Sequence, residues 1–313
     1  MKFKKNFVRL KGDASSRIFY RNKNKNLSSI LVYAKKDKKL NLLIYDAINK
    51  ILLGNNILAP KLLSENYSKN YIEIEDFGDQ TVFSVLNKSK VNKLEIFKRI
   101  IRLLGKLQLI HQRKIKNFKK INYKIPTYSS KILLEEAKLF TDWYLDKHFS
   151  KSEKIIFKKK FIKVVKNLIK KLHYKNVTFV HRDFHVSNLM MVKKKIAVID
   201  TQDALIGNKT YDLASLIDDV RFKTSMNIKN KLFNYYLKSQ KKINKSNFKN
   251  DFEIISVLRN LKIIGIFKRL AVRDKKKKYL KLIPYAWNLI KLRSKNNDKF
   301  KNLNILLDAI EKD

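Results

Sequence analysis

The 313-residue chain carries 72 Lys and Arg residues against 27 Asp and Glu, which gives a formal net charge of +45. Its length predicts one large domain or two lobes, and its 44% hydrophobic content is sufficient for a buried core. It contains no cysteine, which excludes disulfides, thiolate nucleophiles and cysteine-ligated zinc sites.

The positive charge by itself points to nucleic acid or an anionic membrane as a partner. Only 12 of the 72 basic residues are arginines, and the lysines are spread along the whole chain instead of forming a basic arm. Lys, Asn and Ile, all abundant here, are encoded by AT-rich codons, so genome composition explains the excess. We therefore do not expect nucleic-acid binding as the main function, although a general attraction for anionic substrates remains.

The N-terminal sequence MKFKKNFVRL is charged and lacks the apolar core of a secretory signal. No run of about 18 uncharged apolar residues exists anywhere in the sequence. We expect a soluble, cytoplasmic protein with no membrane insertion. Nothing in the sequence indicates its oligomeric state.

Residues 1–78 predict a small α/β lobe. Short apolar runs around Phe19-Tyr20 and at 30–33 are typical of strands, and residues 40–53 repeat their apolar positions with helical spacing. Residues 71–76 alternate as a strand does, before a Phe-Gly-Asp break. These elements suggest a sheet accompanied by one helix.

Residues 79–313 predict a larger and mainly helical lobe. Apolar periodicity indicates helices at 96–110, 131–148 and 153–173, and again from Tyr211 to the end. An irregular insert with strand and loop character occupies residues 179–203. The fold class is therefore α+β, and the cleft between two such lobes is a natural ligand site.

The six glycines form neither a Walker GxxxxGK[ST] pattern nor a GxGxxG pattern, and no GxSxG elbow is present. A P-loop, a Rossmann nucleotide site and an α/β-hydrolase nucleophile are therefore not expected. The chemistry must come from another part of the chain.

The insert FVHRDFHVSNLMMVKKKIAVIDTQD concentrates polar residues between two short apolar runs. His181, Asp183 and His185 alternate, so on a strand they would share one face and could begin a metal site. The other three histidines, however, lie far away in predicted helices, which is too few for the histidine cluster of a binuclear hydrolase. A polar hairpin without chemistry is a second interpretation.

A third interpretation accounts for the spacing of Asp183, Asn188 and Asp200. Phosphoryl transfer needs a carboxylate to accept the proton of the acceptor hydroxyl, together with hard oxygen ligands that hold Mg²⁺ against the nucleotide phosphates. An H-R-D-x-x-x-x-N loop followed by a strand that ends in Asp supplies all three side chains. Asp183 would be the catalytic base, and Asn188 and Asp200 the metal ligands.

The motifs HRDFHVSNLM, IDTQDA and YDLASLIDD resemble the catalytic loop, the metal-binding Asp and the following helix of the aminoglycoside phosphotransferase family, over residues 179–219. GDASSRIFYR at 12–21, FTDWYL at 140–145 and the block 258–287 resemble a bacterial subgroup of that family. This subgroup includes the anomeric 1-kinases of N-acetylmuramate and N-acetylglucosamine. The resemblance spans nearly the whole chain.

The resemblance implies a protein-kinase-like fold with two lobes, 1–78 for nucleotide binding and 79–313 for the catalytic loop and substrate. It implies ATP and Mg²⁺ as cofactors and a sugar hydroxyl as acceptor, most specifically the anomeric hydroxyl, in peptidoglycan recycling. The turn over the nucleotide phosphates would comprise Gly12, Asp13, Ala14, Ser15 and Ser16, and the adenine-reading hinge Glu75, Asp76 and Phe77.

The same resemblance suggests sugar contacts from His185, Gln202, Asp203 and Trp143, and an anchoring role for Asp212 in the loop structure. For Trp143 an ordinary place in a helix core is an equal alternative, and His185 could equally serve as a structural hydrogen-bonding residue.

Two departures from the kinase pattern keep alternatives open. The run Leu31-Val32-Tyr33-Ala34 has no lysine where kinases carry one on the third strand, and the helix at 40–53 has no glutamate. Lys35 or Lys36 would fill the place only with a shift, so phosphate positioning is unexplained. Ser16 and Ile18 also differ from the usual opening motif.

Two alternative functions therefore remain. The protein could be a phosphotransferase for another small acceptor, such as a choline-like amine, or a non-catalytic nucleotide-binding regulator.

Overall fold

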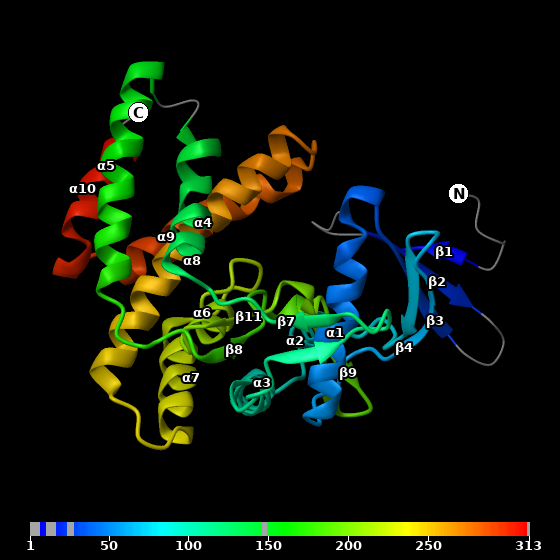
Figure 1. The fold of residues 1–313 in the computed structure, drawn as a ribbon. Coiled ribbons are helices and arrows are strands. Elements are labelled where there is room, and N and C mark those ends of the chain that lie inside the picture. Colours follow the sequence, from blue (N-terminus) through cyan, green and yellow to red (C-terminus); the bar gives the residue numbers. More distant parts are fainter. Residues whose placement is uncertain (1–6, 11–16, 24–27, 146–148, 312–313) are drawn as a thin grey trace. The chain divides into compact units, whose positions relative to one another are not determined.

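The computed structural model describes residues 7–10, 17–23, 28–145 and 149–311, and the chain divides into two compact units. The first unit comprises Met1–Pro126 and His181–Leu205, and the second Thr127–Val180 and Ile206–Asp313 (Figure 1). The predicted catalytic insert therefore packs with the N-terminal part of the chain. The functional lobe boundary at residue 78 stays a prediction.

The first unit is built on an antiparallel sheet with one long helix against one of its faces (Figure 1). Alternate residues of the central strands, such as Val32 and Ile72, face Leu42 and Tyr45 of the helix in a buried cluster, as the two-residue period of a strand requires. The strand order is β1-β2-β3-β5-β4, with β1 (Phe7–Arg9), β2 (Ile18–Lys23), β3 (Ser28–Tyr33), β5 (Tyr71–Glu75) and β4 (Leu62–Asn66), and the helix is α1 (Leu40–Gly54).

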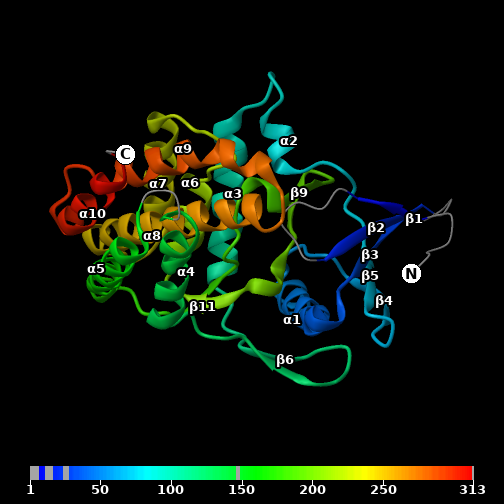
Figure 2. The same cartoon turned by 90° about the horizontal axis from the view of Figure 1, so that it is seen from above.

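Two capped helices and two hairpins complete this unit (Figure 2). Thr81 and Asn92 accept hydrogen bonds from backbone N–H groups in the first turns of their helices, which explains where these helices begin. The elements are α2 (Val82–Leu86), α3 (Lys93–Gln108), the hairpin of β6 (Lys114–Lys116) and β7 (Asn122–Lys124), and the hairpin of β9 (Leu189–Val192) and β10 (Lys195–Val198).

The second unit is mainly helical, with one small pairing of β8 (Thr178–Val180) and β11 (Leu205–Gly207). Its central helix α8 (Lys245–Val272) is buried on nearly all sides between residues 254 and 265, a stretch that includes the polar residues Ser256, Arg259, Asn260 and Lys262. The surrounding helices are α4 (Ser130–Trp143), α5 (Lys151–Lys170), α6 (Tyr211–Ile217), α7 (Met226–Ser239), α9 (Ile283–Ser294) and α10 (Lys301–Glu311).

These elements confirm the predicted α+β class and most of the predicted helices and strands. The helix predicted at 131–148 is shorter, because α4 ends at Trp143. Tyr144 instead stacks on Phe140 at a centroid distance of 5.3 Å, and its hydroxyl accepts a hydrogen bond of 3.2 Å from Trp287 Nε1. None of the helices within the described residues is long and apolar enough to span a membrane.

Helices α4 and α8 approach closely at Gly265. A Cβ atom at this position would lie 2.2 Å from the Leu139 carbonyl oxygen and 2.6 Å from the Phe140 nitrogen, both backbone atoms. Only a glycine permits this contact, so the close packing of the two helices depends on residue 265. Gly105 in α3 is a useful contrast, because a Cβ there would meet nothing within 4 Å.

We expect Gly265→Ala to destabilise the protein by about 1–3 kcal/mol, because α4 or α8 must move to make room for the methyl group. Gly105→Ala should be neutral or stabilising by up to about 1 kcal/mol, since alanine is the better helix former. Urea unfolding followed by circular dichroism measures both. Equal effects of the two substitutions would contradict the close contact at Gly265.

Candidate functional site

The turn that carries Asp183 is tightly organised within the first unit. His181 is fully buried, and its Nε2 lies 3.0 Å from the carbonyl oxygen of Ile199. Arg182 adopts a left-handed backbone conformation with φ of 77°, and the His185 N–H donates to the Asp183 carbonyl at 3.0 Å. Asp183 is therefore presented, partly exposed, from a fixed turn.

The hairpin β9–β10 brings Asn188 and Asp200 to one end. Leu189 pairs with Val198, and the N–H of Ile199 donates to the Asn188 carbonyl at 3.1 Å. The two apolar runs of the insert thus form adjacent strands, as expected. Asn188 Nδ2 donates to the carbonyl oxygen of Asp183 at 3.1 Å, which ties the predicted metal ligand to the turn of the predicted base.

Asp200 is held by its neighbours in the chain. Its backbone is left-handed, with φ of 63° and ψ of 44°, a conformation that Asp tolerates better than most residues. The hydroxyl of Thr201 donates to Asn49 Oδ1 at 2.6 Å, and Asn49 Nδ2 donates to the Pro60 carbonyl at 3.0 Å. Both Thr201 and Asn49 are buried. Helix α1 therefore anchors the residue that follows Asp200.

The donor set fits Mg²⁺. The Asp200 carboxylate and the Asn188 amide oxygen are hard ligands, and Mg²⁺ usually takes one or two such protein groups and completes its shell with phosphates and water. Among the described residues, no group of three or more His, Asp or Glu side chains is arranged to hold a metal ion. Asn188 and Asp200 as metal ligands, and Asp183 as base, stay predictions.

The structure places a basic side chain against Asp200 that the sequence analysis did not single out. Arg17 forms an ion pair through Nη2 with Asp200 Oδ1 and is only 5% exposed. Its guanidinium lies 5.4 Å from the ring centre of Phe19 and 5.6 Å from that of Tyr45. Burial raises the pKa of Tyr45 to about 12, although the Arg17 charge acts in the opposite direction. The position of Arg17 within GDASSRIFYR was the available signal.

The predicted hinge follows β5 and is fixed by polar contacts. The Asp76 carboxylate pairs with Arg21 at 2.6 Å and accepts hydrogen bonds from the Ser28 hydroxyl and the Gly78 N–H. Burial acts to raise the pKa of Asp76, but these hydrogen bonds and the Arg21 charge hold it below its usual value. Gly78 has φ of 76°, which favours glycine at this turn.

The backbone of Glu75 remains part of the sheet, because it pairs with Ser29 of β3 and its N–H donates to the Lys61 carbonyl at 2.9 Å. Phe77 is half-buried. The predicted phosphate turn, comprising Gly12, Asp13, Ala14, Ser15 and Ser16, lies outside the described residues. The nucleotide-binding roles of all these residues stay predictions.

Three of the predicted sugar contacts lie in the first unit. His185 is buried with its Nε2 3.4 Å from Asn188 Nδ2, so its ring faces the turn. Gln202 donates to the exposed carboxylate of Asp203 at 2.7 Å, and Arg182 lies 3.9 Å from the same carboxylate. Tyr123, which was not predicted as a site residue, lies near enough to Asp203 to feel its charge. Burial and the Asp203 charge together raise the pKa of Tyr123 to about 12.

Trp143 belongs to the second unit, where it is half-buried at the end of α4. Asp212 lies in the same unit, on α6, and is 1% exposed. The roles of all the predicted sugar contacts and of Asp212 stay predictions.

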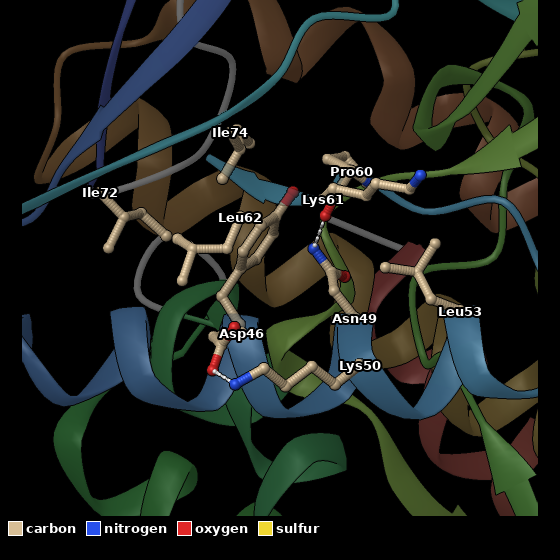
Figure 3. A pocket seen from close by; sticks show the side chains of 10 residues that line it. Asp46, Asn49, Lys50, Leu53, Pro60, Lys61, Leu62, Ile72 and Ile74 are labelled. Carbon is tan, nitrogen blue, oxygen red and sulfur yellow. Dashed lines mark hydrogen bonds and ion pairs between the residues drawn. The ribbon is translucent and has the colours of Figure 1, made fainter. Parts of the chain in front are cut away.

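A pocket of about 270 Å³ lies in the first unit between α1 and strands β4 and β5 (Figure 3). Its wall is mostly apolar, with one ion pair of 2.9 Å between Asp46 and Lys50. Burial raises the pKa of Asp46, and Lys50 opposes that effect. None of the predicted site residues lines this pocket. The lining residues are Tyr45, Asp46, Asn49, Lys50, Leu53, Pro60, Lys61, Leu62, Ile72 and Ile74.

The sequence model of the phosphotransferase enzyme family matches residues 6–244, which is most of the chain and includes both the sheet and the β9–β10 hairpin. The protein belongs to this family. It is therefore an enzyme that transfers phosphoryl groups, and the expected aminoglycoside phosphotransferase relationship is confirmed.

Two relatives of this phosphotransferase are named N-acetylmuramate/N-acetylglucosamine kinase. The Pseudomonas aeruginosa protein is 25% identical over 83% of this chain and 75% of its own length. The Neisseria meningitidis protein is 26% identical over 94% of this chain and 87% of its own length. The identity is low, but the alignments span most of both proteins.

A solved structure, amicoumacin kinase hAmiN in complex with AMP-PNP, Ca²⁺ and Ami, is similar to the phosphotransferase, with a TM-score of 0.62. It covers 92% of this chain and 89% of that chain at 12% identity. The likeness confirms the predicted protein-kinase-like fold, with its small sheet-based lobe and its larger helical lobe.

The second unit of the phosphotransferase contains buried carboxylates that bear on the choice of acceptor. Asp218 is fully buried, with its two oxygens bonded to Lys229 at 3.0 Å and to Arg293 at 2.9 and 3.0 Å. Burial alone would raise the pKa of Asp218, but these two cations lower it to about 2. Asp218 is thus already neutralised within the fold and is not a free anion for a cationic amine.

The Thr201–Asn49 contact generates a prediction about the loop of Asp200. Thr201→Val should destabilise the protein by about 1–3 kcal/mol, because it leaves the buried Asn49 Oδ1 without its donor. Thr201→Ser keeps the hydroxyl and should cost less. Urea unfolding of the two variants measures the difference. Equal losses would mean that packing of the threonine methyl, and not the hydrogen bond, holds the loop.

Proposed function

We propose that the protein is an ATP- and Mg²⁺-dependent kinase that phosphorylates a sugar hydroxyl, most specifically the anomeric hydroxyl of N-acetylmuramate or N-acetylglucosamine. One observation carries this proposal. The β9–β10 hairpin places Asn188 and Asp200 at one end, and the Asn188 side chain bonds directly to the backbone of Asp183. A base and two hard oxygen ligands in one compact group are what phosphoryl transfer requires.

In the proposed reaction the Asp183 carboxylate accepts the proton of the acceptor hydroxyl. The hydroxyl oxygen forms a bond to the γ-phosphorus of ATP, while the bond from that phosphorus to the β–γ bridging oxygen breaks. ADP leaves with the bridging oxygen, and the sugar phosphate is the second product. The backbone that carries Asp183 is held by the contact of His181 Nε2 with Ile199 and by the hydrogen bond from the His185 N–H to the Asp183 carbonyl.

Asn188 and Asp200 would hold the metal, which when bound neutralises charge on the β- and γ-phosphates. The segment Gly12–Ser16 would cover the phosphates, and the backbone of residues 75–77 would contact adenine. The pairing of Asp76 with Arg21 supports this assignment, because it fixes the backbone of the hinge independently of nucleotide.

The names of similar proteins support an amino sugar as the acceptor. Four relatives with 22–26% identity share the name N-acetylmuramate/N-acetylglucosamine kinase. The buried Asp218 is paired with Lys229 and Arg293 and is therefore not available to a cationic acceptor such as choline. His185, Gln202, Asp203 and Trp143 are the proposed sugar contacts, and Tyr123 joins them as a group close to Asp203. The sugar 1-phosphate would be the starting point for nucleotide-sugar synthesis in cell-wall salvage.

We expect Asp183→Asn to lower kcat with N-acetylmuramate by at least about 10²-fold, because loss of a general base typically has this effect. Asp37→Asn, which removes an exposed carboxylate from the same unit, should leave turnover unchanged. A coupled assay of ADP release measures both variants. A loss of less than about tenfold in Asp183→Asn would argue against its role as the base.

A panel of acceptors tests the substrate class. With ATP and Mg²⁺, we expect turnover of N-acetylmuramate and N-acetylglucosamine, and none of choline or ethanolamine. Replacement of the free sugar by its 1-O-methyl glycoside should abolish turnover, because the anomeric hydroxyl is then blocked. Turnover of the glycoside would move the reaction to another hydroxyl. Nucleotide binding without turnover of any acceptor would indicate a non-catalytic nucleotide-binding protein.

A further inference from the structure

Strand β3 and helix α1, both within the described residues, do not carry the lysine and glutamate that protein kinases use to position phosphates. Strand β3 reads SSILVY and helix α1 reads LNLLIYDAINKILLG, so neither the strand lysine nor its glutamate partner is present. Lys50, the one lysine of α1, pairs with Asp46 beside the pocket of Figure 3. Lys35 and Lys36, which follow β3, are exposed.

Arg17 has the position and the environment that this role needs. It stands immediately before β2, and its guanidinium is paired with the predicted metal ligand Asp200. The rings of Phe19 and Tyr45 flank the guanidinium, and Tyr45 belongs to α1, the helix that in a kinase would carry the glutamate. An aromatic pair can hold a cation in place without neutralising it.

We propose that Arg17 is the phosphate-binding cation of this enzyme and replaces the missing strand lysine. This inference rests on the proposed function. In the absence of nucleotide, Arg17 neutralises Asp200. With nucleotide bound, the guanidinium contacts the phosphates while Asp200 takes its place as a metal ligand.

The chemistry of the guanidinium suits this exchange. It has five N–H donors in a rigid fork that matches the geometry of phosphate oxygens, and the ion pair with Asp200 is made through Nη2. The rings of Phe19 and Tyr45, with centres 5.4 and 5.6 Å from the guanidinium, flank it on the side of the sheet and of α1. Arg17 can therefore turn from a carboxylate to a phosphate without leaving its buried position.

Binding of the non-hydrolysable analogue AMP-PNP, measured by calorimetry with and without Mg²⁺, tests the inference independently of turnover. We expect Arg17→Gln to weaken AMP-PNP binding by about 10- to 100-fold, the usual range for a hydrogen bond to a charged group. Binding of adenosine should be unchanged, because it has no phosphate. Arg102→Gln removes the same charge from an exposed position on α3 and should change neither affinity.

A double-mutant cycle with Asp200→Asn separates direct phosphate contact from an indirect role through Asp200. If Arg17 contacts phosphates, Arg17→Gln still weakens metal-free AMP-PNP binding by about tenfold or more in the Asp200→Asn background. If Arg17 serves only to neutralise Asp200, the substitution has no effect in that background, and the inference is wrong. Arg17→Lys keeps a cation at the site, so partial retention of AMP-PNP affinity supports phosphate contact.

Two further outcomes are decisive. Thermal unfolding shows whether Arg17→Gln folds. Where it does not, Arg17→Met replaces it, because its side chain has a similar length and no charge. In the Asp200→Asn background we then expect Arg17→Met to bind AMP-PNP more weakly than the protein that retains Arg17, with unchanged adenosine binding, and equal AMP-PNP affinity overturns the inference. Wild-type protein that binds and turns over ATP, while Arg17→Gln binds AMP-PNP normally, overturns this inference alone. Failure of the wild-type protein to bind AMP-PNP at all overturns the proposed function as well.

Discussion

The buried side chain of Asn49 joins the three segments on which the candidate site rests. Its amide nitrogen donates to Pro60, its oxygen accepts from Thr201, and the helix that carries it packs on the sheet through Leu42 and Tyr45. Because an unmade hydrogen bond in a buried place is costly, the three segments are held in one arrangement. The packing of α1 therefore helps to fix the backbone at Asp200, in addition to the short hairpin that precedes it.

The hairpin adds the second constraint. The N–H of Val198 donates to the Leu58 carbonyl at 2.8 Å, and the N–H of Met191 donates to the Gln80 carbonyl at the same distance, so both of its strands are attached to segments that precede α3. The hairpin is thus built into the first unit although it lies far along the chain. A hairpin of four-residue strands would be marginal in isolation, and these attachments explain why it is ordered.

The sequence was informative where the signal was local. Helical periodicity at 40–53 and the spacing from Asp183 to Asp200 can be read without tertiary structure, and the elements they predict are present. Strand β1 and the β6–β7 hairpin were missed because three residues carry too little periodicity to distinguish a strand from a loop. The tertiary contacts of these segments, and not their own sequences, determine that they form strands.

The ion pair of Arg17 with Asp200 could not have been predicted in this way, because 183 positions separate the two residues and no local pattern links them. The same holds for Tyr123, whose relation to Asp203 depends on the folded chain. The missing strand lysine was visible in the sequence, but what stands in its place was not. Sequence patterns therefore do not predict side chains whose roles depend on contacts with residues far away in the sequence.

The positive charge of the chain and the buried Arg17 act at different distances. Exposed lysines raise the local concentration of anions such as ATP and N-acetylmuramate, which carries a carboxylate, but salt screens this attraction beyond about 8–10 Å. A buried guanidinium is screened much less and has one fixed direction. The surface charge can favour an encounter with any anion. The position of a bound phosphate, in contrast, requires a cation in a fixed place, such as Arg17 between Asp200 and two aromatic rings.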